Sequence, residues 1–244
     1  MLIVENLIKS FKINNKKQQI LKNISFKMKK GEKVVIIGPS GSGKSTFIRC
    51  INLLTVPSSG KIIFKGEDIT SKKTNIRKIR QKIGMVFQQF NLFSNLTVLG
   101  NIILAPVDSG VLSKDKAENL ALELLDKVGL TSVKDSYPNM LSGGQQQRIA
   151  IIRSLAMSPD LLLFDEPTSA LDPEMVKEVL KVMEELAQSG MTMIIVTHEM
   201  QFAKRIGSRI LFIDNGEILE DKSSDDFFEN PENERVKEFL SKVI

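Results

Sequence analysis

The stretch Gly38-Pro39-Ser40-Gly41-Ser42-Gly43-Lys44-Ser45-Thr46 decides the fold class of this chain. It matches the phosphate-loop pattern G-x-x-x-x-G-K-[ST], with a buried strand predicted before it at 34–37 and a helix predicted after Lys44. Glycines let successive backbone N–H groups point at one anion, and the helix N-terminus adds positive dipole. We therefore expect Lys44 to reach the β- and γ-phosphates of a nucleoside triphosphate and Ser45 to offer its hydroxyl to Mg²⁺. A glycine-rich turn that only caps a helix is the alternative, and the strand and helix on either side disfavour it.

Two patterns of strands and helices extend outward from this loop. The first third of the chain is rich in β-branched apolar runs, which predict strands at 2–4, 24–26, 34–37, 62–64 and 83–87. After residue 157 the pattern alternates, with strands predicted at 161–164, 193–196 and 210–213 and helices predicted from Asp172-Pro173 and from Met200. Such alternation predicts right-handed crossovers and a mainly parallel core sheet, whereas the strand-rich opening predicts an antiparallel layer.

Residues 90–157 differ from both of these parts, because they are mostly helical in pattern and contain no clear strand. A helix predicted at 114–128 is expected to end at Gly129. The predicted organisation is a single α/β domain over residues 1–244. Residues 1–89 and 158–244 form its core with a β-subdomain, and residues 90–157 form a helical subdomain.

Composition excludes several classes of protein. The 244 residues include one cysteine, Cys50, which excludes a disulfide framework and fits a reducing compartment. No apolar run approaches the ~18–20 residues of a membrane span, and the first residues lack an apolar signal core, so we expect a soluble cytosolic globule. The net charge of +5 invites a nucleic-acid interpretation. However, the densest basic cluster, at 72–82, has no aromatic residue to stack on bases, so a lysine-rich solvated surface is favoured.

Two adjacent acids, Asp165 and Glu166, follow the apolar run at 161–164. Because side chains alternate across a strand, these two carboxylates cannot share one role. Asp165 is placed to hold Mg²⁺ beside a phosphate loop, and Glu166 is placed to polarise an attacking water as a general base. A solvated acidic turn is the alternative, and the presence of a phosphate loop in the same chain disfavours it.

Three further features, at 141–145, Gln88 and His198, have roles that the residues alone leave open. The run Leu141-Ser-Gly-Gly-Gln145 opens a predicted helix, which is either an ordinary helix cap or a second anion-receptive N-terminus. Gln88 ends a predicted strand. His198, the one histidine in the chain, follows another strand. A lone histidine is usually structural, although the carboxyl end of a parallel strand is where ligands bind.

Taken in order, these motifs resemble the ATP-binding subunits of ABC transporters across nearly the whole chain. The elements that carry the resemblance are the phosphate loop at 38–46, Gln88, LSGGQ at 141–145, LLLFDE at 161–166, SALD at 169–172 and His198. The resemblance implies the P-loop ATPase fold, with a RecA-like core, and hydrolysis of ATP with Mg²⁺. Within one subunit it implies catalytic roles for Glu166, His198 and Gln88, a metal site of Ser45, Gln88 and Asp165, and stacking of adenine on Phe11. An ordinary packed phenylalanine is the alternative for Phe11.

The resemblance also implies partners. Two identical subunits would pack head to tail, with each ATP between the phosphate loop of one and the LSGGQ helix of the other. The residues that would contact the nucleotide across this homodimer are Ser142, Gly143, Gly144, Gln145 and Asp172. The dimer would act on integral membrane permease subunits, and through them on a substrate-binding protein, at the cytoplasmic face of the membrane. No nucleic-acid partner is expected.

Finer features resemble one branch of the family, the importers of polar amino acids such as histidine, glutamine and arginine. They include the run 87–93, the sequence Thr197-His-Glu-Met200 and the C-terminal run that begins at Phe227. Gly100, Ile152 and Ser154 depart from the residues expected there, a glutamate and two alanines. None of the three is a predicted phosphate or metal ligand.

Two other functions would use a phosphate loop. A small-molecule kinase would need a hydroxyl-bearing substrate and a lid in place of the LSGGQ helix. A DNA-repair or translation ATPase of the same superfamily would need a long coiled-coil insertion or a second cassette, for which 244 residues leave no room. Both are therefore disfavoured.

Overall fold

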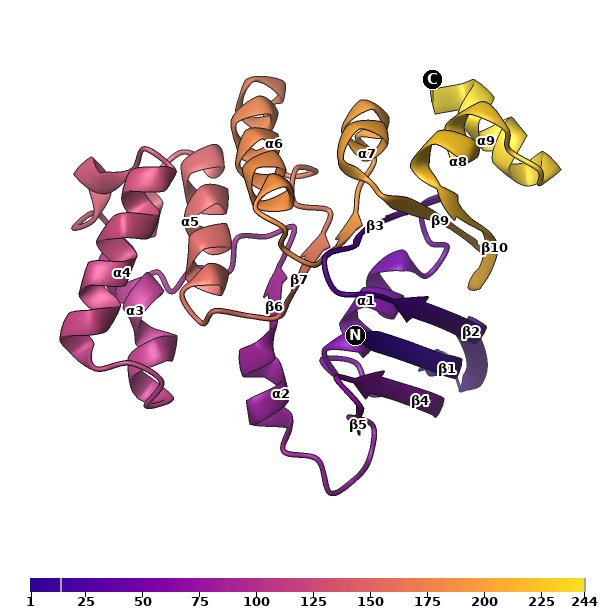
Figure 1. The fold of residues 1–244 in the computed structure, drawn as a ribbon, viewed down its shortest axis with the longest axis horizontal. Coiled ribbons are helices and arrows are strands. Elements are labelled where there is room, and N and C mark those ends of the chain that lie inside the picture. The colour runs from indigo at the N-terminus through magenta and orange to yellow at the C-terminus, as the bar shows by residue number, and fades with distance from the viewer. Residues whose placement is uncertain (14, 244) are drawn as a thin grey trace. The chain divides into compact units, whose positions relative to one another are not determined.

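The computed structural model describes residues 1–13 and 15–243 of the chain, which divide into two compact units. The first unit comprises residues 1–80 and 190–244, and the second comprises residues 81–189. Helix α2 (Ile76–Lys82) runs from the first unit into the second. The other elements of the first unit (Figure 1) are β1 (Leu2–Ile13), β2 (Lys16–Met28), β3 (Lys33–Ile37), α1 (Lys44–Ile51), β4 (Ser59–Phe64), β5 (Glu67–Asp68), β8 (Met193–Val196), α7 (Met200–Ile206), β9 (Arg209–Asp214), β10 (Glu217–Ser223), α8 (Ser224–Glu229) and α9 (Glu234–Val243).

The predicted antiparallel layer is confirmed as a four-stranded sheet in the order β2-β1-β4-β5. Strands β1 and β2 are much longer than the apolar runs that predicted them. Only the second half of β2 alternates between buried and exposed residues, and its first four residues, 16–19, are all exposed. Because those residues are polar, hydrophobic pattern could not reveal them, although they pair with β1 without a register shift.

The predicted parallel core is confirmed in the same unit. Strand β3 pairs in parallel with β8 on one side and with β9 on the other, and β10 adds an antiparallel edge to β9. Nearly every residue of β3 and β8 is buried, as expected for parallel strands covered on both faces. The carboxyl end of β3 therefore leads directly into the phosphate loop at 38–43, and α1 follows it.

Helices α8 and α9 pack against one face of this sheet and form an aromatic cluster that the sequence pattern did not predict. The ring of Phe212 in β9 contacts Phe227 at 6.4 Å and Phe239 at 5.1 Å between centroids. The cluster also includes Val35 and Ile37 of β3, so it supports the strand that carries the phosphate loop. An ion pair from Arg235 to Asp214 (2.8 Å) fastens α9 to the end of β9.

Phe227→Ala is expected to lower the free energy of unfolding of the chain by about 3–5 kcal/mol, because a fully buried phenylalanine leaves a cavity that its neighbours cannot fill. The adjacent Phe228, which is only partly buried, offers a matched control, and Phe228→Ala should cost less than about 2 kcal/mol. Denaturant unfolding measures both values. Equal losses would show that burial does not set the cost of substitution at these two positions.

The second unit holds the parallel pair β6 (Ile83–Val86) and β7 (Leu161–Asp165) and a group of helices. Residues 90–157, all within the part that the structure describes, contain no strand. The predicted helix at 114–128 is confirmed, and Gly129 follows it with a φ of 67°. The helical elements (Figure 1) are α3 (Val98–Asp108), α4 (Lys114–Lys127), the 3-10 turns η1 (Thr131–Val133) and η2 (Pro138–Met140), α5 (Gly143–Leu155) and α6 (Pro173–Gln188).

Helix α5 is central to this unit, because it contacts α3, α4, α6 and strand β6. Figure 1 shows α3, α4 and α5 side by side. The N-cap residue of helix α3 is Thr97, whose hydroxyl accepts a hydrogen bond from the backbone N–H of Gly100 (3.1 Å). Gly100 therefore takes part in an ordinary helix cap, and its divergence from the expected glutamate leaves the start of α3 intact.

Candidate functional site

The phosphate loop in the first unit has a backbone that only glycine fits. Gly38 has a φ of 148°, and a Cβ there would lie 2.0 Å from the carbonyl oxygen of Ile213. Gly43, the N-cap of α1, has a φ of 105°, and a Cβ there would lie 3.1 Å from the carbonyl oxygen of Ile20. At both positions the loop therefore packs directly against the backbone of a neighbouring strand, which a side chain would prevent.

Lys44 lies over this loop. Its side chain is buried, and its Nζ donates hydrogen bonds to the carbonyl oxygens of Gly38 (2.9 Å) and Pro39 (2.8 Å). The hydroxyl of Ser42 is also buried and has no hydrogen-bond partner among the residues that the structure describes. A buried ammonium group and an available hydroxyl in a glycine-rich loop fit the oxygens of a phosphate chain.

Cys50, in the last turn of α1, is fully buried, and removal from water raises the pKa of its thiol to about 12. The thiolate is the reactive form, so almost none is present at neutral pH. We expect the native chain at pH 8 to resist a thiol-labelling reagent and to take up one label per chain after unfolding, as measured by mass. Rapid labelling of the native chain would contradict this burial.

His198 lies just after β8, the strand beside β3, and its side chain is exposed. The backbone N–H of Thr197 donates to the carbonyl of Ile36, so this turn is tied to the last residues of β3. Because β3 and β8 are parallel, His198 and the phosphate loop lie at the same edge of the sheet.

Phe11, the residue expected to stack on adenine, is on β1. Its side chain is 39% exposed, and the Nζ of Lys9 lies 4.7 Å from its ring centroid.

The second unit brings three other predicted site residues together. In the parallel pair Val86 is opposite Phe164, so Gln88, two residues beyond β6, and Glu166, two residues beyond Phe164, leave the pair at the same level. Asp165 ends β7 and is buried, whereas Glu166 is partly exposed. Gln88 is exposed in a bend.

Glu166 has an unusual backbone, with a φ of 49° in the left-handed region. This conformation costs a non-glycine residue about 1–2 kcal/mol, and such strain gathers at functional sites. The carbonyl oxygen of Glu166 accepts hydrogen bonds from the backbone N–H (3.3 Å) and the hydroxyl (2.9 Å) of Ser169. The turn therefore holds the carboxylate of Glu166 away from the direction that a regular strand would give it.

The helix cap proposed for LSGGQ is present. Ser142 is the N-cap of α5, its hydroxyl accepts from the N–H of Gln145 (3.3 Å), and the Gln145 side chain accepts from the N–H of Ser142 (3.0 Å). The two glycines have a packing reason, since a Cβ at Gly144 would lie 3.0 Å from the Cβ of Met175 in α6. Contact with a nucleotide on another subunit remains a prediction. Asp172 is the exposed N-cap residue of α6, and its side chain makes no capping hydrogen bond.

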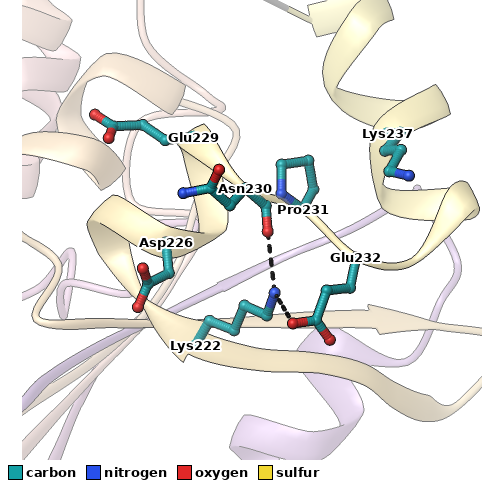
Figure 2. Close-up of a pocket in the computed structure, with 7 residues that line it drawn as sticks. All are labelled: Lys222, Asp226, Glu229, Asn230, Pro231, Glu232 and Lys237. Carbon is teal, nitrogen blue, oxygen red and sulfur yellow. Dashed lines mark hydrogen bonds and ion pairs between the residues drawn. The ribbon is translucent and has the colours of Figure 1, made fainter.

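A polar pocket of about 730 Å³ lies at the other end of the first unit, between β10, α8 and α9 (Figure 2). The Nζ of Lys222 crosses it to the carbonyl oxygen of Asn230 (3.0 Å) and the carboxylate of Glu232 (2.9 Å). None of the predicted site residues lines this pocket. Its internal bonds join the C-terminal helices to the sheet, which indicates a structural role.

The arrangement of these residues defines a class of protein. A glycine-rich loop with a buried lysine joins a buried parallel strand to a helix, and an acidic pair ends another parallel strand. These features together define the P-loop nucleotide-binding proteins.

Comparison with known proteins identifies the family. The ABC transporter family matches residues 21–169. The chain is 57% identical over 244 residues, covering both chains completely, to the arginine transport ATP-binding protein ArtM of Bacillus subtilis. It is 54% identical over 225 residues to the glutamine transport ATP-binding protein GlnQ of Escherichia coli, covering 92% of this chain and 94% of that one. A solved structure, a dimeric ATP-binding cassette MJ0796 bound to ADP and Pi, has a TM-score of 0.83 at 37% identity, covering 92% of this chain and 99% of that one.

This chain belongs to the ABC transporter family, as an ATP-binding cassette. The predicted family and fold class are confirmed by these matches. No helix in the part of the chain that the structure describes is long and apolar enough to span a membrane.

Gln147, a buried side chain of α5, was missed at the level of sequence. The sequence did contain a sign of this residue, since Gly144, Gln147 and Ile151 follow helical spacing and so share one face of the helix. The structure shows that all three are buried. A long polar side chain on such a face needs a buried partner, which points to a specific contact rather than to packing.

Proposed function

We propose that this chain is the ATP-hydrolysing subunit of an importer for polar amino acids and that it drives a separate membrane permease. The observation that carries the proposal is the 57% identity, over the whole chain, to an arginine transport ATP-binding protein. Other relatives are named as transport proteins for glutamine and for glutamate and aspartate, which supports polar amino acids as the substrate class.

The residues divide the chemistry between them. Lys44 and the loop at 38–46 bind the phosphates of ATP, and Phe11 stacks on the adenine. Oxygen donors suit Mg²⁺, and the hydroxyl of Ser45, the amide oxygen of Gln88 and the carboxylate of Asp165 would hold it. Mg²⁺ held there would neutralise negative charge on the phosphates of ATP.

Three residues that follow the carboxyl ends of parallel strands activate the water. Glu166 accepts a proton from the attacking water as a general base. Gln88 and His198 orient that water, and His198 also donates a hydrogen bond to the γ-phosphate. The reaction transfers the phosphoryl group to water in line and needs no covalent intermediate with the protein.

Two copies of the chain complete each site. The N-terminus of α5 in one copy, at 142–145, and Asp172 contact the nucleotide bound by the other copy. ATP binding then favours the closed dimer, because these contacts exist only in that state, and hydrolysis releases it. Closure would act on permease subunits through the helical region at 90–157, at the cytoplasmic face of the membrane, with the substrate-binding protein engaged only through the permease.

The proposal is tested by two measurements on the full chain. Purified protein should release inorganic phosphate from Mg-ATP into water, with no acceptor needed and no stimulation by DNA or RNA. Expressed in Bacillus subtilis lacking ArtM, it should restore uptake of labelled arginine, with leucine uptake as the control. Transfer of phosphate to a small molecule, or a rate that depends on nucleic acid, would favour the two alternative functions.

A further inference from the structure

Gln147 is fully buried in α5 and makes two hydrogen bonds to other parts of the second unit. Its Nε2 donates to the carbonyl oxygen of Phe87 at 3.1 Å and to the carbonyl oxygen of Pro167 at 2.8 Å. Its own amide oxygen has no hydrogen-bond partner among the described residues. A buried amide with one unsatisfied atom costs free energy that an apolar side chain of the same size would avoid, so packing alone does not explain it.

The two carbonyls have a common feature. Phe87 directly precedes Gln88, and Pro167 directly follows Glu166. One amide group therefore bridges the backbone of both loops that carry the water-activating residues. The main chain beside Gln88 and Glu166 must be held in place, because the carboxylate of a general base has to lie within hydrogen-bond reach of its water.

Two other side chains of α5 fasten the same region. Arg153 donates to the carbonyl oxygens of Asn91 (2.7 Å) and Phe90 (3.4 Å). The hydroxyl of Ser154 donates to the carbonyl oxygen of Met85 (3.2 Å). These bonds reach strand β6 and the loop after Gln88, but neither reaches the Glu166 turn. Gln147 alone among these three joins both loops.

We propose that Gln147 is a positioning residue that couples the N-terminus of α5 to the loops of Gln88 and Glu166. This inference rests on the proposed function, which gives those two residues their roles. Gln147 is five positions after Ser142, the N-cap of the helix that contacts the nucleotide of the other subunit. A shift of α5 on nucleotide binding is thus transmitted through one amide to the water-activating residues of its own subunit, which links the two ATP sites of the dimer.

Gln147→Glu tests the bridge, because it keeps the size of the side chain and removes both donors. We expect kcat for ATP hydrolysis to fall between about 10- and 100-fold, the scale of misplaced catalytic groups. The KM for ATP and the affinity for a fluorescent ATP analogue should stay within about threefold, since the phosphate loop is unchanged. The Hill coefficient for ATP should fall toward 1.

A pH profile separates positioning from a general structural role. Burial between two carbonyls raises the pKa of the introduced carboxyl, and its protonated form restores one donor. The ratio of variant to wild-type activity should therefore rise as pH falls from 8 to 6. Gln147→Met, which has no donor at any pH, should lose kcat to a similar extent with a ratio that does not change with pH.

Ser154→Ala is the matched control, because it removes a hydrogen bond from the same helix to strand β6 and leaves both loops held. Its kcat should stay within about twofold of wild type. If wild-type protein hydrolyses ATP and Gln147→Glu retains normal kcat, Hill coefficient and pH profile, the bridge is rejected while the proposed function stands. If the wild type does not hydrolyse ATP, the proposed function itself fails. If neither Gln147 variant folds, the amide serves folding, and a positioning role is likewise rejected.

Discussion

Glu166→Gln is expected to reduce ATP hydrolysis at least about 100-fold while ATP binding is retained, which is the scale of a lost general base. The amide has the size of the carboxylate but cannot take a proton from water. The turn around residue 166 should persist, because its hydrogen bonds from Ser169 go to the main-chain carbonyl and not to the side chain. The substitution therefore removes the chemistry and leaves the geometry.

The measurement is phosphate release under single-turnover and steady-state conditions, together with affinity for a fluorescent ATP analogue. The dimer should also accumulate in ATP, because closure no longer ends in hydrolysis, and size-exclusion chromatography would detect it. Glu118→Gln is a suitable control, since it loses only an exposed ion pair with Lys114 of the same unit (3.8 Å), which contributes little. Near-normal turnover in Glu166→Gln would assign the base to another residue.

The strained backbone at Glu166 bears on how far sequence can predict a site. Its position after four apolar residues was readable, because a buried parallel strand has a nearly continuous hydrophobic pattern. The left-handed φ of 49° was not, since no glycine or asparagine marks it. That conformation goes with a local turn that Ser169 closes through its N–H and hydroxyl, and the residue types at 166–169 did not indicate that turn.

The same contrast holds across the fold. Strands β3, β7 and β8 were predicted almost to the residue, because a strand that is buried on both faces has a continuous run of apolar residues in its sequence. The outer half of β2 and the short strand β5 were not predicted, because exposed pairing leaves no hydrophobic pattern. Hydrogen bonds to main-chain carbonyls, such as those of Gln147, escape sequence reasoning for a related reason, as a carbonyl is present at every position.

Helices α8 and α9 show a different limit. The run that begins at Phe227 was used only as a likeness to one branch of the family, yet its aromatic rings form part of the core beneath β3. Short amphipathic helices gain most of their stability from tertiary packing, so local pattern gives weak evidence for them. Support for the phosphate loop thus comes partly from residues about 190 positions later in the chain.

Lys44→Ala is expected to abolish measurable ATP binding, with affinity falling at least about 100-fold, because a buried ammonium group that meets phosphate oxygens contributes about 2–5 kcal/mol. In the structure its Nζ donates to the carbonyls of Gly38 and Pro39. The charge is therefore already desolvated and held at the loop before ATP arrives, so little is lost in ordering it.

Two comparisons isolate this charge. Lys61→Ala removes an exposed lysine of β4 in the same unit and should leave ATP affinity within about twofold. Thermal unfolding of Lys44→Ala without nucleotide should show a folded chain with a modestly lower midpoint, because two carbonyls lose a donor, whereas the stabilisation that Mg-ATP gives the wild type should vanish. A variant that still binds ATP with wild-type affinity would mean that backbone N–H groups alone hold the phosphates, and the role assigned to the buried lysine would have to be withdrawn.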